Sequence, residues 1–224
     1  MFFGGAGVST ASNIPDFRGA NGIYNTENEW GLPPERIISH SFFVRRTKDF
    51  YDYYKKYMVY PDARPNEVHT ALARLEKEGK IKAVLTQNID GLHQKAGSKN
   101  VLELHGSVHR NYCEHCGKAF PLSYILQSTG VPRCDACGGP VRPDVVLYEE
   151  ALDGDILEAA VEDIAAADLL IIGGTSLVVY PAAGLIRYFQ GSHLVLVNKT
   201  ATAADSRADL VIHDAIGAVF AQLP

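Results

Sequence analysis

The chain has 224 residues, of which 46% are hydrophobic and 21% charged, and its formal net charge is −5. This size and composition are typical of one soluble globular domain, or of one domain with a smaller inserted lobe. The acidic balance argues against a nucleic-acid-binding protein, and neither an apolar run of about 20 residues nor a signal peptide is visible. We therefore expect a cytoplasmic protein whose partners are neither nucleic acids nor membranes.

A short apolar run at the N-terminus leads into a glycine-rich loop, Gly-Gly-Ala-Gly-Val-Ser over residues 4–9. Glycines after a strand let the backbone approach a phosphate, and a following helix start offers free N–H groups to an anion. Thr10 stands where the dinucleotide fingerprint has its third glycine. No acidic residue ends an apolar strand about twenty residues further on, since Glu27 and Glu29 lie in polar, loop-like surroundings. The loop therefore indicates either a phosphate site or only a tight strand-to-helix turn.

A long loop is expected over residues 13–24, because Pro15 disfavours a helix at the residue before it. Asp16, Phe17 and Arg18 could offer a carboxylate, a stacking face and a guanidinium to one ligand. Arginine suits a pyrophosphate well. The alternative is an internal Asp16–Arg18 salt bridge.

Two helical segments precede the next strand. Residues 35–58 have a helical pattern with many aromatic side chains, which indicates core packing more than a ligand site. Asn66 is expected to cap a helix over Glu67–Lys77 that stops at Gly79. His69 lies inside this helix, and we expect it to be structural.

Polar residues follow two apolar runs. The run Ala83–Leu85 is followed by Thr-Gln-Asn-Ile-Asp over residues 86–90, and the run Val101–Leu104 by His105. Open α/β sheets bind ligands at the carboxyl ends of their strands. His105 is therefore a candidate general base, because imidazole titrates near physiological pH. The alternative is a set of turn residues and a structural histidine.

The four cysteines of the chain form two C-x-x-C pairs with 17 residues between them: Cys113, Cys116, Cys134 and Cys137. Two such pairs can place four thiolates around one zinc ion, which leaves no position for water or substrate. We therefore expect a structural zinc site that holds a small lobe together, and two disulfides are the alternative. His109 and His115 flank the first pair but exceed the ligand count.

The segment after the cysteines contains Pro143, which excludes a central strand. Val145, Val146 and Leu147 could form an edge that pairs with an extended peptide, or only a connecting strand.

The C-terminal part alternates between helices and apolar strands. Helices are expected over Asp153–Ala166, after Pro181 and from Ile216. Strands are expected over Leu169–Ile172, His193–Val197 and Leu210–Ile212. Such strands without alternation indicate an α/β fold with a parallel sheet covered on both faces. Glycine and small polar residues follow the first two of these strands, and they suggest a nucleotide site: Gly174, Thr175, Ser176 and Asn198.

Taken together and in this order, these motifs resemble those of the sirtuins, the NAD-dependent protein-lysine deacylases, and most of all the bacterial ones. The resemblance rests on residues 5–9, 14–19, 86–90, 104–106, the two C-x-x-C pairs, and residues 174–176 with Asn198. It covers nearly the whole chain.

The resemblance implies a Rossmann-type doubly wound parallel sheet with a smaller lobe built from two insertions. The NAD-binding domain would comprise residues 1–19, 66–107 and 144–224. The helical insertion would comprise residues 20–65 and the zinc-binding insertion residues 108–143.

The resemblance also implies a reaction in which the acyl group passes from lysine to ADP-ribose and nicotinamide is released. NAD would be consumed as a co-substrate, zinc would be structural, and the partners would be acyl-lysine proteins or peptides. His105, the general base, and Asn88 would be catalytic, and Val145, Val146 and Leu147 would dock the peptide. The NAD-binding residues would be Gly5, Ala6, Ser9, Asp16, Phe17, Arg18, Gln87, Asn88, Ile89, Asp90, Gly174, Thr175, Ser176, Asn198 and Ile216. The alternatives are an NAD-dependent protein ADP-ribosyltransferase and a non-catalytic zinc-ribbon binding module.

The chain departs from the family pattern in several places. Gly4 stands where the family usually has Thr, Asn13 where it usually has Gly, and residues 148–150 read Tyr-Glu-Glu instead of aromatic-Gly-Glu. The sequence begins at the first strand, without the segment that sirtuins usually carry before it, so we expect an effect on N-terminal packing and stability.

The positions that match the Tyr-x-x-Arg pair of desuccinylating sirtuins are Tyr51 and Tyr54, without an arginine. Burying a carboxylate without a cation is costly, so the resemblance implies deacetylation, or removal of longer uncharged acyl groups, over desuccinylation.

Overall fold

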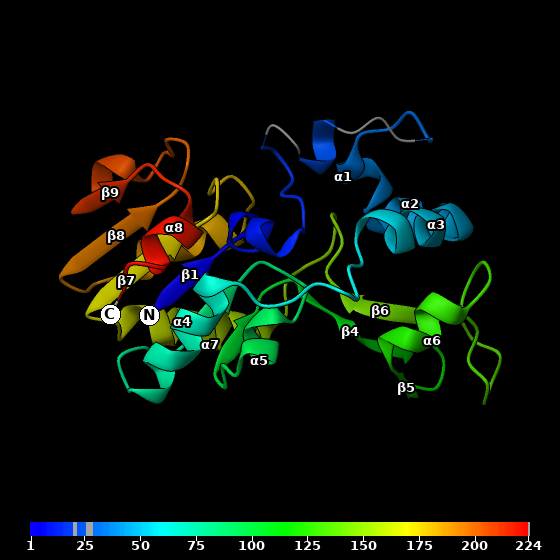
Figure 1. The fold of residues 1–224 in the computed structure, drawn as a ribbon. Coiled ribbons are helices and arrows are strands. Elements are labelled where there is room, and N and C mark those ends of the chain that lie inside the picture. Colours follow the sequence, from blue (N-terminus) through cyan, green and yellow to red (C-terminus); the bar gives the residue numbers. More distant parts are fainter. Residues whose placement is uncertain (20–21, 26–28, 224) are drawn as a thin grey trace.

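A six-stranded parallel sheet forms the centre of the larger lobe (Figure 1). The computed structural model describes residues 1–19, 22–25 and 29–223, so the first two residues of the predicted helical insertion and Glu27 lie outside the described residues. The strands run in the order β3-β2-β1-β7-β8-β9. They are β1 (Phe2–Gly4), β2 (Val84–Thr86), β3 (Val101–Glu103), β7 (Leu169–Gly173), β8 (His193–Val197) and β9 (Leu210–Ile212). The predicted fold class, α/β with a parallel sheet, is confirmed.

The strand order reverses at the centre of this sheet. From β1 the chain builds outward through β2 and β3, and it later returns to the other side of β1 as β7. The loops that leave β1 and β7 therefore start side by side, and the chain then continues from them to opposite faces of the sheet. In open α/β sheets a ligand crevice forms at this point, outside the carboxyl ends of the strands.

Helices cover both faces of the sheet, as the non-alternating strands predict. One face packs against α4 (Glu67–Lys77), α5 (Leu92–Ala96) and α8 (Ile216–Phe220), and the other against α7 (Gly154–Ala165) and the 3-10 helix Ala182–Tyr188. Phe2 and Phe3 contribute to these two opposite cores because successive strand residues point to opposite faces.

The predicted N-cap of α4 is confirmed. The Asn66 side chain accepts a hydrogen bond from the Val68 N–H at 3.0 Å, and Nδ1 of His69 accepts one from the Asn66 N–H at 3.2 Å. The segment that follows Pro181 differs from the prediction, since it is a 3-10 helix. Further 3-10 helices span Ala6–Val8, Thr10–Ser12, Ile23–Asn25 and Asp205–Arg207.

Residues 35–58 form several helices where the sequence suggests one helical region: α1 (Pro34–Ile37), α2 (His40–Arg45) and α3 (Thr47–Tyr57). Ser39 starts α2, because its hydroxyl accepts a hydrogen bond from the Phe42 N–H at 3.2 Å. The aromatic stripe packs into a core, as predicted, with Phe50, Tyr51 and Tyr54 at most 1% exposed.

The smaller lobe also contains a three-stranded antiparallel sheet in the order β5-β4-β6, seen beside α1–α3 in Figure 1. The strands of this sheet are β4 (Gly106–Cys113), β5 (Ala119–Phe120) and β6 (Val141–Val145). The helix α6 (Leu122–Gln127) lies between β5 and β6 in the sequence. Pro143 lies in β6, which is an edge strand, in agreement with the expectation from proline.

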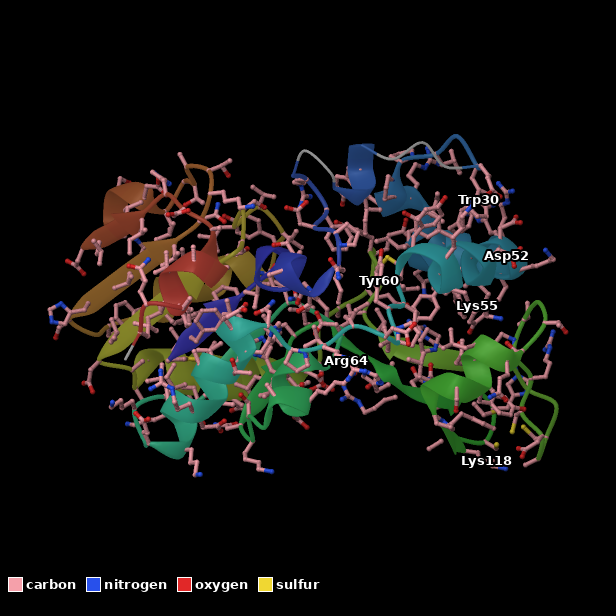
Figure 2. The ribbon with its side chains drawn as sticks, viewed as in Figure 1. Trp30, Asp52, Lys55, Tyr60, Arg64 and Lys118 are labelled. Carbon is pink, nitrogen blue, oxygen red and sulfur yellow. The ribbon has the colours of Figure 1, made fainter. Side chains whose placement is uncertain are left out.

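A single stretch of chain leads from α3 of the smaller lobe to α4 of the larger one. It carries Tyr60 and Arg64, which Figure 2 labels between the two lobes. Within the described part of the chain, no helix is long and apolar enough to cross a membrane.

Candidate active site

A cavity of about 1250 Å³ is lined by residues of both lobes. Of the two tyrosines that the resemblance places at the acyl end of the site, Tyr54 lines this cavity, whereas Tyr51 is fully buried and does not. Apart from the four cysteines, every residue that the sequence analysis assigns to catalysis, NAD binding or peptide docking lines the cavity. They come from the glycine-rich loop, residues 16–18, 87–90, His105, residues 145–147, residues 174–176, Asn198 and Ile216. The fold thus brings together segments that are up to two hundred residues apart in the sequence.

The loops after β1 and β7 approach each other closely. The Gly7 N–H donates to the carbonyl oxygen of Gly174 at 2.8 Å, and a Cβ on Gly7 would lie 2.8 Å from Gly174 Cα. A Cβ on Gly5 would lie 2.7 Å from the Thr175 Cβ. Gly174 also has a positive φ of 60°, which side chains rarely adopt. These glycines are therefore needed where the two loops meet.

The polar residues after β2 form hydrogen bonds with the glycine-rich loop and with the loop after β7. The hydroxyl of Ser9 donates to Asp90 Oδ2 at 2.6 Å and accepts from Asn88 Nδ2 at 3.0 Å. Gln87 Nε2 donates to the Thr175 hydroxyl at 3.1 Å. These hydrogen bonds fix the Asn88 and Asp90 side chains at the cavity wall.

The carboxyl group of Asp90 is partly buried at the cavity wall. Burial raises its pKa, while hydrogen bonds from the Ser9 hydroxyl and the Leu92 N–H act in the opposite direction. The Leu92 N–H lies 2.9 Å from Asp90 Oδ1. The carboxyl oxygens are thus held by two donors of the chain itself.

His105 lies at the end of β3, and its Nδ1 is 2.9 Å from the backbone carbonyl oxygen of Gln87. A carbonyl oxygen only accepts, so Nδ1 must carry the proton. Burial lowers the pKa of His105 below its ordinary value, and the hydrogen bond to Gln87 acts against this shift. The neutral ring therefore has its proton on Nδ1 and a free lone pair on Nε2, as a general base requires.

Residues 16–18 form an ordered part of the loop that lines the cavity. Asp16 Oδ1 accepts from the Gly19 N–H at 2.8 Å, and the Arg18 guanidinium lies 4.9 Å from the centre of the Tyr24 ring. Phe17 packs edge-on against Tyr24 at 5.7 Å. Asp16 thus contacts Gly19 and Arg18 contacts Tyr24. These contacts do not support the alternative of an internal Asp16–Arg18 salt bridge.

The segment Val145–Leu147 leaves β6 along the cavity wall. The Val146 N–H donates to the His105 carbonyl oxygen at 3.0 Å, which ties the segment to the candidate base. The Leu147 N–H donates to Glu150 Oε2 at 2.9 Å, and Arg142 donates to both oxygens of the same carboxylate at 2.5 and 2.6 Å. Burial alone would raise the pKa of Glu150, but these donors and His40 hold it below its ordinary value.

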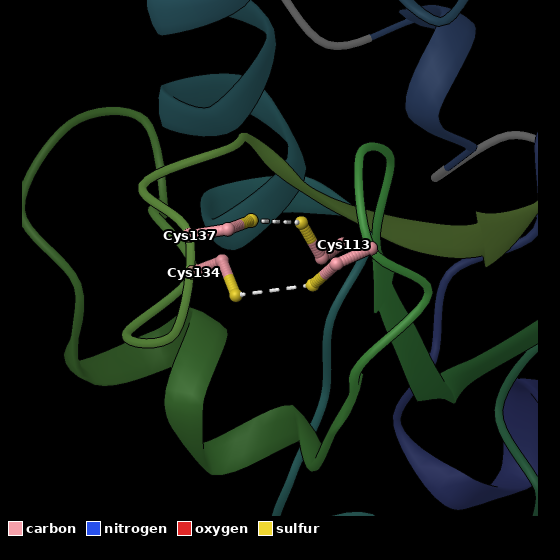
Figure 3. Close-up of side chains that lie close together, drawn as sticks. Cys113, Cys134 and Cys137 are labelled. Carbon is pink, nitrogen blue, oxygen red and sulfur yellow. Dashed lines mark hydrogen bonds between the residues drawn. The ribbon is translucent and has the colours of Figure 1, made fainter.

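The four cysteines of the smaller lobe lie close together, and Figure 3 labels three of them. The Sγ atoms are 3.4 Å apart for Cys113 and Cys137 and 3.7 Å apart for Cys116 and Cys134, and all four lie within 4.8 Å of one another. All four thiols are free. A tetrahedron with Zn–S bonds of about 2.3 Å has edges of about 3.8 Å, so the cluster fits one zinc ion.

Sequence reasoning missed several residues that line the cavity. Tyr57 and Met58 reach it from the end of the aromatic helix, which the helical pattern assigns to core packing, beside Tyr54, which the family resemblance does indicate. His109 also lines it, although its place beside the first cysteine pair drew attention only as a surplus zinc ligand. No sequence signal distinguishes the face of β4 that His109 occupies, because the register of this strand against β6 shifts between Ser107 and Asn111.

Residues 5–181 match the model of the Sir2 family. The chain belongs to the Sir2 family. This Sir2 family member is 62% identical to a protein of Clostridium acetobutylicum named NAD-dependent protein deacetylase, over 98% of this chain and 90% of that protein. A Staphylococcus aureus protein of the same name is 46% identical over 95% of this chain and 87% of its own length.

Solved Sir2 structures share the fold of this family member. One, in complex with a deacetylated p53 peptide and 3'-O-acetyl ADP-ribose, superposes with a TM-score of 0.89 at 41% identity. It is matched over 98% of this chain and 89% of its own. Another, with a p53 peptide and NAD⁺, has a TM-score of 0.85 at 39% identity over 99% of this chain and 90% of its own.

Proposed function

We propose that this Sir2 family member is an NAD-dependent protein-lysine deacylase. It transfers the acyl group from a lysine side chain to ADP-ribose and releases nicotinamide. The observation that carries the proposal is the free Nε2 of His105, in a cavity that the polar loop 87–90 and the segment Val145–Leu147 both line. The names of the curated relatives and the ligands of the solved Sir2 structures support it.

The proposal divides the chain into an NAD-binding domain and a smaller lobe. Residues 1–19, 66–107 and 144–224 form the first, and residues 20–65 and 108–143 form the two insertions that make the second. This division is supported by the six-stranded parallel sheet and the separate three-stranded sheet. The cavity between them is large enough for a dinucleotide and a peptide side chain together.

NAD supplies the carbon that nicotinamide leaves and the ribose hydroxyl that takes up the acyl group. The glycine-rich loop with Gly5, Ala6 and Ser9 is the phosphate side of its site, since its backbone lies open to the cavity. Arg18 offers a guanidinium, and Phe17 a ring face, from the neighbouring loop. Residues after β7 and β8 and the first residue of α8 complete the binding set: Gly174, Thr175, Ser176, Asn198 and Ile216.

Residues 87–90 hold the nicotinamide end, because amide and carboxyl groups from Gln87, Asn88 and Asp90 converge there with the apolar side chain of Ile89. The Ser9 hydroxyl orients the Asn88 side chain. Asn88 is the second residue to which we assign a catalytic role, beside His105. His105 accepts the proton of the attacking hydroxyl at Nε2, while Nδ1 stays bonded to Gln87. Val145, Val146 and Leu147 dock the peptide as an added strand.

Cys113, Cys116, Cys134 and Cys137 hold a structural zinc ion, one per chain. Four thiolates fill a tetrahedral site, so the ion takes no part in the reaction. Cysteines that stay reduced suit a cytoplasmic location, which we propose for the protein.

The test is to incubate the zinc-loaded protein with NAD and an acetyl-lysine peptide and to follow the products by mass spectrometry. Nicotinamide, deacetylated peptide and O-acetyl-ADP-ribose should appear in equal amounts. An ADP-ribose adduct on a protein, without loss of acetyl, would instead indicate the ADP-ribosyltransferase. NAD binding without either reaction would refute the proposed activity on this substrate.

A further inference from the structure

His109 lines the cavity but has no place in the proposed reaction. It lies on β4, and its Nε2 is 3.0 Å from the backbone carbonyl oxygen of Asp90. Because a carbonyl oxygen only accepts, Nε2 of His109 must carry a proton and donate it. The contact therefore links this ring to the backbone of the loop that holds Asn88 and Asp90.

Three donors in residues 105–109 bind three carbonyl oxygens in residues 87–90. His105 Nδ1 donates to Gln87 at 2.9 Å, and the Val108 N–H donates to Ile89 at 3.0 Å. The His109 bond to Asp90 is the third. Of the three, this is the one that a single side-chain change can remove without touching the candidate base.

An irregular stretch of β4 places His109 in this position. The register of β4 against β6 shifts between Ser107 and Asn111, so it pairs none of Val108, His109 and Arg110 with a residue of β6. Irregular ladder positions often turn a side chain toward an active site. The His109 N–H is also bonded to the Ser107 hydroxyl at 3.3 Å, which holds this stretch from inside.

Gly91 shows how closely the ring packs on the loop. Gly91 has a φ of 69°, and a Cβ at this position would lie 2.7 Å from Cδ2 of His109. The imidazole thus contacts the turn between Asp90 and α5, directly after the carbonyl group that it binds. Hydrogen bonding and packing together fix the backbone at residues 90–91.

We infer that His109 is a positioning residue that holds the Ile89–Asp90–Gly91 backbone, and with it the Asp90 carboxyl group, against the base-bearing segment 105–109. The inference rests on the proposed function. Without the His109 bond, the loop keeps its contacts to Ser9 and Leu92 but gains freedom at the Asp90–Gly91 peptide. NAD binding must then also order the Asp90–Gly91 backbone, which weakens the binding.

The experiment compares His109→Ala, His109→Gln and the control His193→Ala in the zinc-loaded full chain. A glutamine amide can donate to the Asp90 carbonyl oxygen as Nε2 of His109 does. His193 is an exposed histidine at the start of β8, outside the cavity lining. We would measure kcat and the KM for NAD, and the hydrogen exchange of the amides of residues 88–92 in the free protein.

We expect His109→Ala to lower kcat/KM for NAD about threefold to tenfold, as for the loss of one hydrogen bond. Most of the change should fall on the KM for NAD, because the chemical groups stay in place. Exchange at residues 88–92 should be faster. His109→Gln should restore both properties, and His193→Ala should leave both at wild-type values.

Wild-type kinetics and exchange in His109→Ala would overturn the inference, and so would a His109→Gln variant as impaired as His109→Ala. A wild-type protein that does not consume NAD would refute the proposed function. In that case the exchange at residues 88–92 still decides whether His109 holds the loop.

Discussion

The imidazole of His105 and the backbone of Gln87 share a hydrogen bond of 2.9 Å between Nδ1 and the carbonyl oxygen. This contact joins the end of β3 to the polar loop that follows β2. It also fixes the tautomer, so that Nε2 is the atom free to accept a proton. The candidate base and the proposed nicotinamide loop are therefore oriented by one another.

Replacing His105 with Ala should abolish deacylation while the fold persists. General base catalysis contributes about 10²–10⁴-fold, so the rate of peptide deacetylation should fall at least a hundredfold. The melting temperature should stay near wild type, and NAD binding measured by calorimetry should weaken by no more than about tenfold, because the bond to the Gln87 carbonyl oxygen is also lost. Undiminished deacetylation by the His105→Ala variant would exclude His105 as the base.

The pH dependence of kcat/KM should have its acidic limb below pH 6.5. Burial lowers the pKa of His105 from its ordinary value of about 6.5, so the ring stays neutral and able to accept a proton until the pH falls below this value. Activity should thus be nearly constant from pH 7.5 to 6.5 and decline only at lower pH. A decline centred above pH 6.5 would contradict the buried, neutral base.

The convergence of the site could be predicted from the sequence because polar residues end apolar strands, and parallel strands end at one edge. The structure also explains how two departures from the family pattern are accommodated. Asn13 and Glu149 stand where the family usually has glycine, and both have positive φ, 61° and 75°. The backbone thus keeps the conformation that favours glycine, and Glu149 is held by the Ser41 N–H at 2.8 Å.

Other features depend on tertiary contacts that local patterns do not encode. The register shift that turns His109 toward Asp90 arises from the pairing of β4 with β6. The segment 35–58 breaks into separate helices where Ser39 pairs with Tyr148, more than a hundred residues away. Serine is a common N-cap residue, but the residues around Ser39 do not show this distant pairing.

Removing zinc should unfold the smaller lobe before the larger one. Cys113 and Cys134 belong to the core that also contains Phe120 and Ile125, so the metal site and the lobe share their packing. A Cys116→Ser variant should lose bound zinc, measured by elemental analysis, together with a lower melting temperature and lost activity. Lys118→Ala, which removes the exposed Lys118–Asp135 ion pair and the contact of Lys118 with the Phe120 ring but no cysteine, is the matched control and should keep its zinc. A zinc-free protein with unchanged melting would refute a structural metal.

Acetyl-lysine should be a far better substrate than succinyl-lysine. Tyr51 is fully buried and its hydroxyl donates to the Val141 carbonyl oxygen, whereas Tyr54 lines the cavity. Among the described residues, the only lysine and arginine side chains that line the cavity are Arg18 and Lys199, both from the larger lobe. A succinyl carboxylate would therefore find no cation on the aromatic helices.

Butyryl-lysine is the matched substrate for this comparison, because its chain has as many carbons as succinyl but no charge. An unpaired buried carboxylate costs several kcal/mol, so kcat/KM for succinyl should be about a hundredfold or more below that for butyryl. Faster removal of succinyl than of butyryl would contradict the assignment of this part of the cavity.

Two buried histidines should make the protein unstable in mild acid. His69 and His93 are 0% and 1% exposed, and their ring centres lie 4.7 Å apart. Nε2 of His69 and both ring nitrogens of His93 have no hydrogen-bond partner within the described part of the chain. Burial lowers the pKa of His69 to about 4 and that of His93 to about 3.

In the unfolded chain these histidines take up protons at about pH 6.5, whereas the folded protein binds none until about pH 4. Their contribution to stability is therefore complete above pH 6.5 and is lost as the pH falls toward 4. Urea unfolding at pH 7.5 and pH 5 should show a drop in free energy on the order of a few kcal/mol. A His93→Leu variant should show a smaller drop, while His193→Leu, at an exposed site, should behave as wild type. An equal drop in wild type and His93→Leu would show that His93 does not titrate as a buried group.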